Sequence, residues 1–172
     1  MANDFIPDLS IRNANIGTGN GRNFSGQKRV VNGQVVNAEG MRNFLLLLDD
    51  DVAEMLKQDG WNVKYTKPRD PDDKPTAYIS VDASFGKYPP EVWKKTPNGK
   101  PVKLEEEDMA ALDEDKFLEA HVVVHPRRYD VQGRTGVKAY LRRLLVTVAD
   151  DEFSDYFGVN NDEDGGDGPL PF

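Results

Sequence analysis

Three short stretches of the sequence interleave basic residues with aromatic ones. They are "GRNFSGQKR" (21–29), "PRRYD" (126–130) and "VKAYLRR" (137–143). In the last stretch, the two-residue period of a strand places Lys138, Tyr140 and Arg142 on one face. This combination suits single-stranded nucleic acid, because cations neutralise phosphates and exposed rings stack on bases, at about 1–3 kcal/mol per base. The alternative is that each ring covers a core edge and each cation is solvated, which explains one stretch more easily than all three.

Residues that could support catalysis or metal binding are few, and each has a simpler explanation. The sequence has no Cys, which excludes disulfides, thiolate zinc sites and cysteine nucleophiles. His121 and His125 lie in a strand-like run, where their backbones would be about 13 Å apart, too far to share one ion. The aspartates of 49–51 and 69–73 could serve a metal-dependent nuclease, but Asp is also expected at helix starts and in turns. We therefore expect no catalytic site, no metal and no cofactor, and keep the nuclease as a weaker alternative.

The negative charge of the sequence is concentrated near its C-terminal end. The net charge is −8, from 22 basic and 30 acidic residues. Eight acidic residues and no Lys or Arg follow Ala149, so residues 1–149 hold equal numbers of acidic and basic residues. Because a neutral body can gather its cations on one face, the acidic total does not exclude a polyanionic partner.

Apolar periodicity predicts a mainly β fold. The expected strands, taken from alternating or continuous apolar runs, cover 42–48, 61–66, 76–85, 120–126 and 137–149. The apolar phase of the last strand changes near Arg142 and Arg143, which predicts a β-bulge. These strands indicate a small, curved five-stranded sheet or barrel with long loops.

Two short helices are expected between the strands. The first follows the strand at 42–48, with Asp49 or Asp50 as its cap and Gly60 as its end. The second covers 104–118, and its packed side would include Leu104, Ala111 and Leu112.

Two segments are expected to be loops. The Gly/Asn-rich segment 17–29 is typical of a mobile loop, and 86–103 is a proline-rich excursion with a hairpin turn at Asn98-Gly99. Trp93 and Tyr88 in that excursion could pack, stack or contact another subunit, which leaves a homodimer open. The aromatic residues on the apolar phase of their strands, expected in the core, are Phe44, Trp61 and Phe85.

The order of several motifs resembles a known family. "RNFSG", "NAEGMRNFLLLLDD", "LKQDGWNVKY", "YISVDASF" and "GVKAYLRRLLVTV", followed by an acidic tail ending in Phe, are similar to single-stranded-DNA-binding proteins of tailed phages that have an OB-fold. The resemblance covers roughly residues 9–157. It implies a five-stranded OB-type barrel, over residues 1–157, that holds single-stranded DNA without strong sequence preference during phage DNA replication and recombination in the host cytoplasm.

The candidate DNA contacts combine the basic and aromatic stretches with this resemblance. The residues expected to neutralise phosphates are Arg22, Lys28, Arg29, Arg42, Lys64, Arg127, Arg128, Lys138, Arg142 and Arg143. Phe24, Tyr129 and Tyr140 are the expected stacking residues; Phe24 has no obvious core to join. The leading hypothesis is a non-catalytic protein that coats single-stranded DNA. The alternative is an acidic adaptor or DNA mimic that binds a protein and never DNA.

The final segment, "NNDEDGGDGPLPF", is expected to form a disordered acidic tail over 158–172. Because acidic residues are followed by an apolar end, we expect the tail to be a ligand for replication or recombination proteins. We also expect it to compete with DNA for the protein's own basic face. The tail residues expected to meet the partner are Asp162, Glu163, Asp164, Asp167, Leu170 and Phe172. With no signal peptide in "MANDFIPDLS" and no apolar run long enough for a bilayer, the sequence predicts a cytoplasmic protein without a membrane partner.

Overall fold

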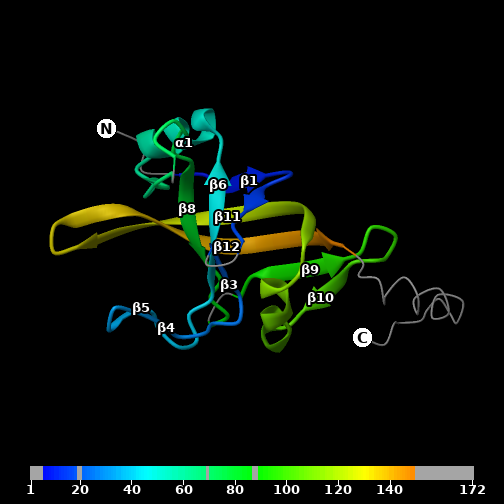
Figure 1. Ribbon diagram of the computed structural model, residues 1–172. Helices are drawn as coiled ribbons and strands as arrows, with labels where there is room; N and C mark the ends of the chain where they lie inside the picture. Colours follow the sequence, from blue (N-terminus) through cyan, green and yellow to red (C-terminus); the bar gives the residue numbers. More distant parts are fainter. Residues whose placement is uncertain (1–5, 19–20, 69, 87–88, 150–172) are drawn as a thin grey trace, which may run out of the picture.

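The computed structural model describes residues 6–18, 21–68, 70–86 and 89–149 of the 172. The described part is mainly β and includes the α-helix α1 and the 3₁₀ helix η2 (Figure 1). The elements are β1 (Leu9–Ile11), β2 (Asn15–Ile16), β3 (Arg22–Asn23), β4 (Arg29–Val31), β5 (Gln34–Asn37), β6 (Asn43–Leu48), α1 (Asp50–Gln58), β7 (Lys64–Tyr65), β8 (Ala77–Asp82), β9 (Glu91–Lys95), β10 (Val102–Leu104), η2 (Glu106–Asp113), β11 (Phe117–Val131) and β12 (Arg134–Val148).

One curved, mixed sheet contains most of the strands. Its order is β1-β11-β12-β8-β6-β2, with β3 beside β6, β7 beside β8, and β9 beside both β10 and β12. The strands at the two ends of this order are consecutive in the chain: β1 pairs with β11, the amide of Ala14 donates to Ala120 O (2.7 Å), and β2 pairs with β6. A single bent segment therefore borders both edges of the sheet. This is an OB-like arrangement, which confirms the predicted fold class. In the described part of the chain the sheet has ten strands instead of five. The first strand of the fold is broken into the short strands β1, β2 and β3, and β7, β9 and β10 are added.

The core lies on the inner face of this curved sheet. Alternate residues of β6, such as Phe44 and Leu46, are buried, as are Ile79 and Val81 of β8. In β12 the buried phase runs Val137, Ala139, Leu141 and then shifts to Leu144, Val146, Val148. The register explains the shift. Val124 pairs with Leu141 and Val123 with Arg143, so no residue of β11 is paired with Arg142. The predicted β-bulge is confirmed, and it falls on Arg142.

Both predicted helices are present, but the second covers only Glu106–Asp113, and Leu104, which was expected on its packed side, belongs to β10. In α1, Asp49 is the N-cap residue, Ala53 and Leu56 are buried, and Gly60 follows the C-terminus with a φ of +92°. The second helix is the 3₁₀ element η2. Its three-residue period buries Met109 and Leu112 together and leaves Ala111 exposed, so the prediction for Ala111 is wrong.

The remaining loop, strand and core predictions are partly confirmed by the structure. In the predicted proline-rich excursion, β9 and β10 form the expected hairpin through a turn in which the Gly99 amide donates to Thr96 O, and β9 also runs parallel to β12. The strand expected over 61–66 is reduced to β7, and Tyr65 is 44% exposed. Trp61 is buried against Val137 of β12, and Phe44 is in the core, as predicted. Phe85 is half-buried against the core, and Tyr88 lies outside the described residues.

The last two strands are far longer than the sequence predicts. The two expected strands end at 126 and begin again at 137, but β11 and β12 stay paired through Val131 and Arg134 and turn at Gln132 and Gly133, both with positive φ. The outer part of this hairpin, residues 126–139, is named the arm. Figure 1 shows it extending from the sheet on the side opposite to β9 and β10.

Candidate nucleic-acid interface

A groove lies between the arm and the strands β7 and β8, with a volume of about 520 Å³. Six of the predicted DNA contacts line it: Lys64, Arg127, Arg128, Tyr129, Lys138 and Tyr140. Lys64 is distant in sequence from the other five, which belong to one hairpin, and the sheet brings them together because β12 pairs with β11 and, at Ala139 and Tyr140, with β8. The groove therefore combines cations with aromatic rings.

Strand register sets which groove side chains share a face. Arg127 is opposite Lys138, and Tyr129 is opposite Gly136, in an antiparallel pair whose partners point to the same side. Lys138 Nζ lies 3.1 Å from Asp82 Oδ2 and 5.6 Å from the centre of the Tyr140 ring. The hydrogen bond that the Lys138 ammonium donates to the Asp82 carboxylate raises the pKa of Lys138 above its ordinary value. Lys138 therefore keeps its positive charge at neutral pH, beside a ring that is half-buried.

Tyr129 is held in the groove by a contact that requires glycine. Its hydroxyl accepts a hydrogen bond from Asn62 Nδ2 (3.2 Å), and the ring lies across Gly136 on the neighbouring strand. A Cβ atom at position 136 would lie 2.5 Å from the Tyr129 hydroxyl and 2.6 Å from Asn62 Oδ1. Any side chain at 136 would thus displace the Tyr129 ring from the wall of the groove.

We expect Gly136→Ala to weaken single-stranded DNA binding severalfold while changing stability little, because the new methyl group displaces side-chain ends and leaves the strand backbone in place. Fluorescence anisotropy with labelled oligo-dT measures the affinity, and thermal unfolding measures the stability. Gly86→Ala is the matched control, since a Cβ there meets only Ser84 Oγ at an ordinary 3.9 Å. Equal affinities for the two variants would show that the position of Tyr129 is unimportant.

Arg22 and Phe24 are core residues, which corrects their assignment as DNA contacts. None of the Phe24 ring is exposed, and it stacks on Phe44 with the ring centres 5.2 Å apart. Arg22 is 5% exposed; its guanidinium donates to the carbonyl oxygens of Gly17, Leu112 and Asp115 and lies 3.7 Å from the centre of the Phe117 ring. Burial lowers the pKa of Arg22, against the opposing charges of Asp113 and Asp115.

The segment around Arg22 and Phe24 is thus not the loop that its composition predicted. Residues Arg22 and Asn23 form β3, which pairs with β6, and the Asp113 carboxylate accepts the backbone amides of Phe24 and Ser25 at 2.6 and 3.1 Å. Glycine and asparagine suggested mobility, but contacts with β6 and η2 fix this segment.

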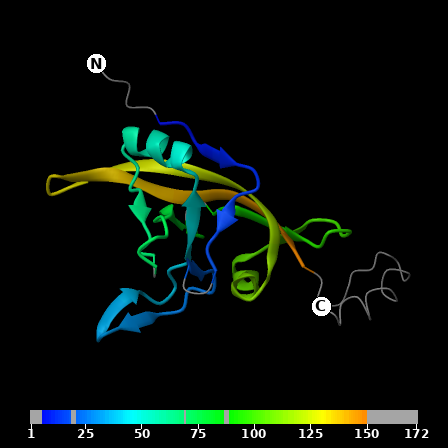
Figure 2. The same cartoon turned by 45° about the horizontal axis from the view of Figure 1, so that its top comes forward.

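Three other predicted contacts lie around the β4–β5 hairpin, which projects from the body of the protein (Figure 2). Lys28 is exposed, and Arg29 is half-buried and donates to Arg22 O at 2.6 Å. Arg42, just before β6, pairs with Glu106 (Nη1 to Oε2, 2.6 Å) and lies over the Phe85 ring. The hairpin itself exposes four valines, Val30, Val31, Val35 and Val36. None of these residues lines the groove.

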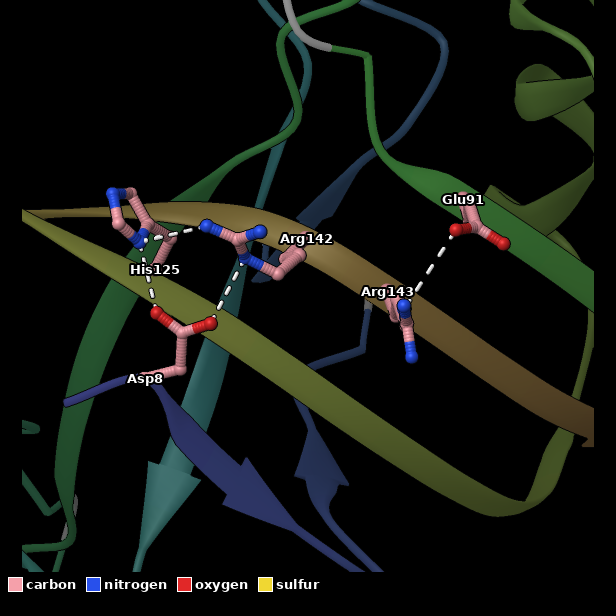
Figure 3. Close-up of polar contacts among 5 residues, drawn as sticks. All are labelled: Asp8, Glu91, His125, Arg142 and Arg143. Carbon is pink, nitrogen blue, oxygen red and sulfur yellow. Dashed lines mark hydrogen bonds and ion pairs between the residues drawn. The ribbon is translucent and has the colours of Figure 1, made fainter.

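Arg142 and Arg143 lie at the bulge of β12, both exposed and each next to a carboxylate (Figure 3). Arg142 Nε is 2.9 Å from Asp8 Oδ2, and Arg143 Nε is 3.7 Å from Glu91 Oε2. They are outside the groove lining but follow Lys138 and Tyr140 along the same strand.

Several other residues line the groove that were not among the predicted DNA contacts: Trp61, Asn62, Ile79, Ser80, Asp82, Val131, Val137 and Ala139. Ser80 and Asp82 occupy the outward phase of β8, so the alternation in "YISVDASF" was a usable signal. No sequence signal pointed to Asn62 or Val131, because their place in the groove depends on the arm.

Within the described ranges, no group of three His, Cys, Asp or Glu side chains is placed to hold a metal ion. His121 and His125 pair instead with Glu119 and Asp8.

An OB-like sheet with an open groove of cations and aromatic rings is typical of nucleic-acid-binding proteins. A family model described as a putative phage ssDNA-binding domain matches residues 8–163, and the chain belongs to this family.

Solved structures of the single-stranded DNA-binding protein of bacteriophage Enc34 have a similar fold. Its complex with ssDNA is 13% identical in sequence, with a TM-score of 0.52 over 85% of this chain and 89% of that one. Another structure of the same protein gives a TM-score of 0.51 and 13% identity, over 93% and 90% of the two chains. At this identity the likeness concerns the fold. No curated protein sequence gives a significant match. No helix in the described part of the chain is long and apolar enough to cross a membrane.

Proposed function

We propose that this protein binds and protects single-stranded DNA, without strong sequence preference and without a catalytic step, during phage DNA replication and recombination. The groove between the arm and β7–β8 is the observation that supports the proposal best. Its cations suit a phosphate backbone and its tyrosines suit stacked bases, and both interactions tolerate any sequence.

The position of the groove in the fold also favours this function. OB-folds bind oligonucleotides on the face of their second and third strands and through the loops after the first and fourth strands. Here these are β6 and β8, the β4–β5 hairpin, and the arm. Lys28 and Arg29 belong to the hairpin, whereas Arg127 and Lys138 belong to the arm. The Enc34 protein was solved in complex with ssDNA, and its similar fold supports the same class of ligand here.

Fluorescence anisotropy tests the proposal. Labelled oligo-dT and a labelled DNA duplex are each titrated with the full chain at several salt concentrations. Among the described residues, four cations line the groove: Lys64, Arg127, Arg128 and Lys138. At roughly 0.7 per phosphate contact, they predict a log–log salt slope of about −3 for the single strand. Single-stranded DNA should bind more tightly than duplex at every salt concentration. Absence of binding in low salt, also after deletion of residues 160–172, would exclude the proposal, and capture of a basic protein in place of DNA would favour the acidic adaptor.

The acidic segment extends the proposal to protein partners. Residues 150–172 lie outside the described part of the structure, and their chemistry, acidic residues followed by an apolar end, supports a protein partner. We infer that Leu170 and Phe172 enter an apolar pocket on a replication or recombination protein, while the neighbouring carboxylates meet basic residues there. The same carboxylates would compete with DNA for Lys64, Arg127 and Lys138 when salt is low.

Deleting residues 160–172 is expected to tighten single-stranded DNA binding at low salt and to abolish partner recruitment. The gain in affinity should shrink as salt rises, because screening weakens the competing charges. Anisotropy of the truncated and full chains, measured from low to high salt, gives both values. Identical low-salt affinities would contradict the competition.

A further inference from the structure

Two consecutive arginines at the β-bulge each hold a carboxylate from another part of the chain. Asp8 precedes β1, and Glu91 is the first residue of β9. The side chains of Arg142 and Arg143 are 50% and 66% exposed, so solvent and ligands reach both of them. Figure 3 shows the two pairs side by side on the strand.

The Asp8 carboxylate sits where an anion would be bound. Its Oδ2 lies 2.9 Å from Arg142 Nε, and its Oδ1 lies 2.8 Å from His125 Nδ1. Arg142 Nη2 is also 3.1 Å from the His125 ring nitrogen, so the three side chains form one cluster. A guanidinium beside an imidazole is a suitable pair of groups for a phosphate oxygen, and an arginine binds phosphate at least as well as it binds carboxylate.

The cluster continues the face that forms the groove. His125 is paired with Tyr140, which lines the groove, and Arg142 follows Tyr140 by two residues on the same side of β12. Arg142 is therefore about 13 Å from Lys138 along the strand, at about 3.3 Å per residue. The bulge also falls between the two parallel neighbours of β12, because β8 pairs at Ala139 and Tyr140, and β9 pairs from Arg143 onward. A DNA strand that leaves the groove along β12 meets Arg142 next.

The geometry points to a phosphodiester-binding site at the bulge, formed by Arg142, Arg143 and His125, which Asp8 and Glu91 occupy in the DNA-free protein. The inference rests on the proposed function, since the ligand is the backbone of the same DNA strand. Exposed ion pairs of this kind contribute little to stability, so the exchange of a carboxylate for a phosphate is easy. Asp8 and Glu91 keep the arginines positioned and at the same time lower the affinity for DNA.

The test compares Asp8→Asn, Arg142→Ala and the double variant with the wild-type chain, by anisotropy with oligo-dT in low salt. Asp8→Asn should tighten binding about two- to fivefold, the range that release of an exposed ion pair allows. Arg142→Ala should weaken binding about three- to tenfold, because it removes a charge-assisted contact. In the Arg142→Ala background, Asp8→Asn should have no effect. Asp51→Asn is the matched control: it removes one exposed carboxylate from α1, on another element.

Three results would overturn the inference. One is the same gain for Asp51→Asn as for Asp8→Asn, and another is a gain that persists without Arg142, because either would mean that only the overall charge matters. The third is weaker binding by Asp8→Asn. Thermal unfolding checks that each variant is folded. If Asp8→Asn does not fold, Glu91→Gln repeats the test, because it removes the carboxylate on β9 that pairs with Arg143. If the wild-type chain itself ignores oligo-dT, the proposed function fails first; if it binds and Asp8→Asn changes nothing, only this site fails.

Discussion

Replacing Tyr140 with alanine is expected to raise the Kd for single-stranded DNA about 5- to 100-fold. The ring is half-buried on the outer face of β12, beside the Lys138 ammonium and opposite Asp82 of β8. A stacked base contributes about 1–3 kcal/mol, and 1.4 kcal/mol corresponds to a factor of ten. Anisotropy with oligo-dT at fixed salt measures the change.

Tyr65→Ala is the control for Tyr140→Ala. Tyr65 is likewise a strand tyrosine with a lysine near its ring, Lys57 at 4.7 Å, but it is more exposed than Tyr140 and is not part of the groove lining. Its loss should leave the affinity nearly unchanged. Tyr140→Phe should bind like the wild type, because it keeps the stacking surface. A similar loss in the Tyr65 and Tyr140 variants would mean that the groove is not the binding site.

The second large effect concerns stability. Phe24→Ala should lower the free energy of unfolding by about 3–5 kcal/mol, because a fully buried ring is lost and a cavity remains between Phe44 and Phe117. This is a large part of the roughly 5–15 kcal/mol that stabilises a domain. Urea unfolding, with the midpoint and the slope fitted separately, measures the change.

The stacking role that the sequence suggested for Phe24 predicts the opposite pattern. A DNA-contacting ring would be lost with little effect on stability and a large effect on affinity. Phe24→Leu separates the two roles, because it keeps much of the buried volume and removes the aromatic face. We expect this variant to be mildly destabilised and to bind oligo-dT like the wild type. A stability loss below about 1 kcal/mol for Phe24→Ala would show that the ring is not part of the core.

Elements with strong local periodicity were predicted accurately from the sequence. The alternation in β8, the apolar run of β6 and the Asp-to-Gly boundaries of α1 depend on neighbours a few residues away, and all three are present. The bulge at Arg142 could also be predicted, because one extra residue shifts the buried phase of a single strand. The same periodicity placed Lys138 and Tyr140 on the face that lines the groove.

Predictions failed where a residue's environment comes from distant parts of the chain. Arg22 and Phe24 lie in a Gly/Asn-rich stretch that locally favours a loop, but Leu112 and Asp113 bind them from about 90 residues away. Asp8 and His125, 117 residues apart, could not be joined by any local pattern. The long arm was missed because "RRYDVQGRTG" contains few apolar residues, and its strands are stabilised mainly by pairing with each other.

By itself, the sequence determined the mainly β class, the two short helices, the bulge and the outward face of β12, because these follow from side-chain alternation and local backbone preferences. Its charge distribution also left a neutral body that is free to bind a polyanion. The tertiary structure alone decided which cations are accessible. It buried Arg22, placed Lys64, Arg127 and Lys138 along one groove, and set Asp8 and Glu91 against Arg142 and Arg143. The physical reason is that solvent exposure and ion pairing are set by whichever strands the sheet brings together, and strand pairing over long sequence separations leaves no local pattern.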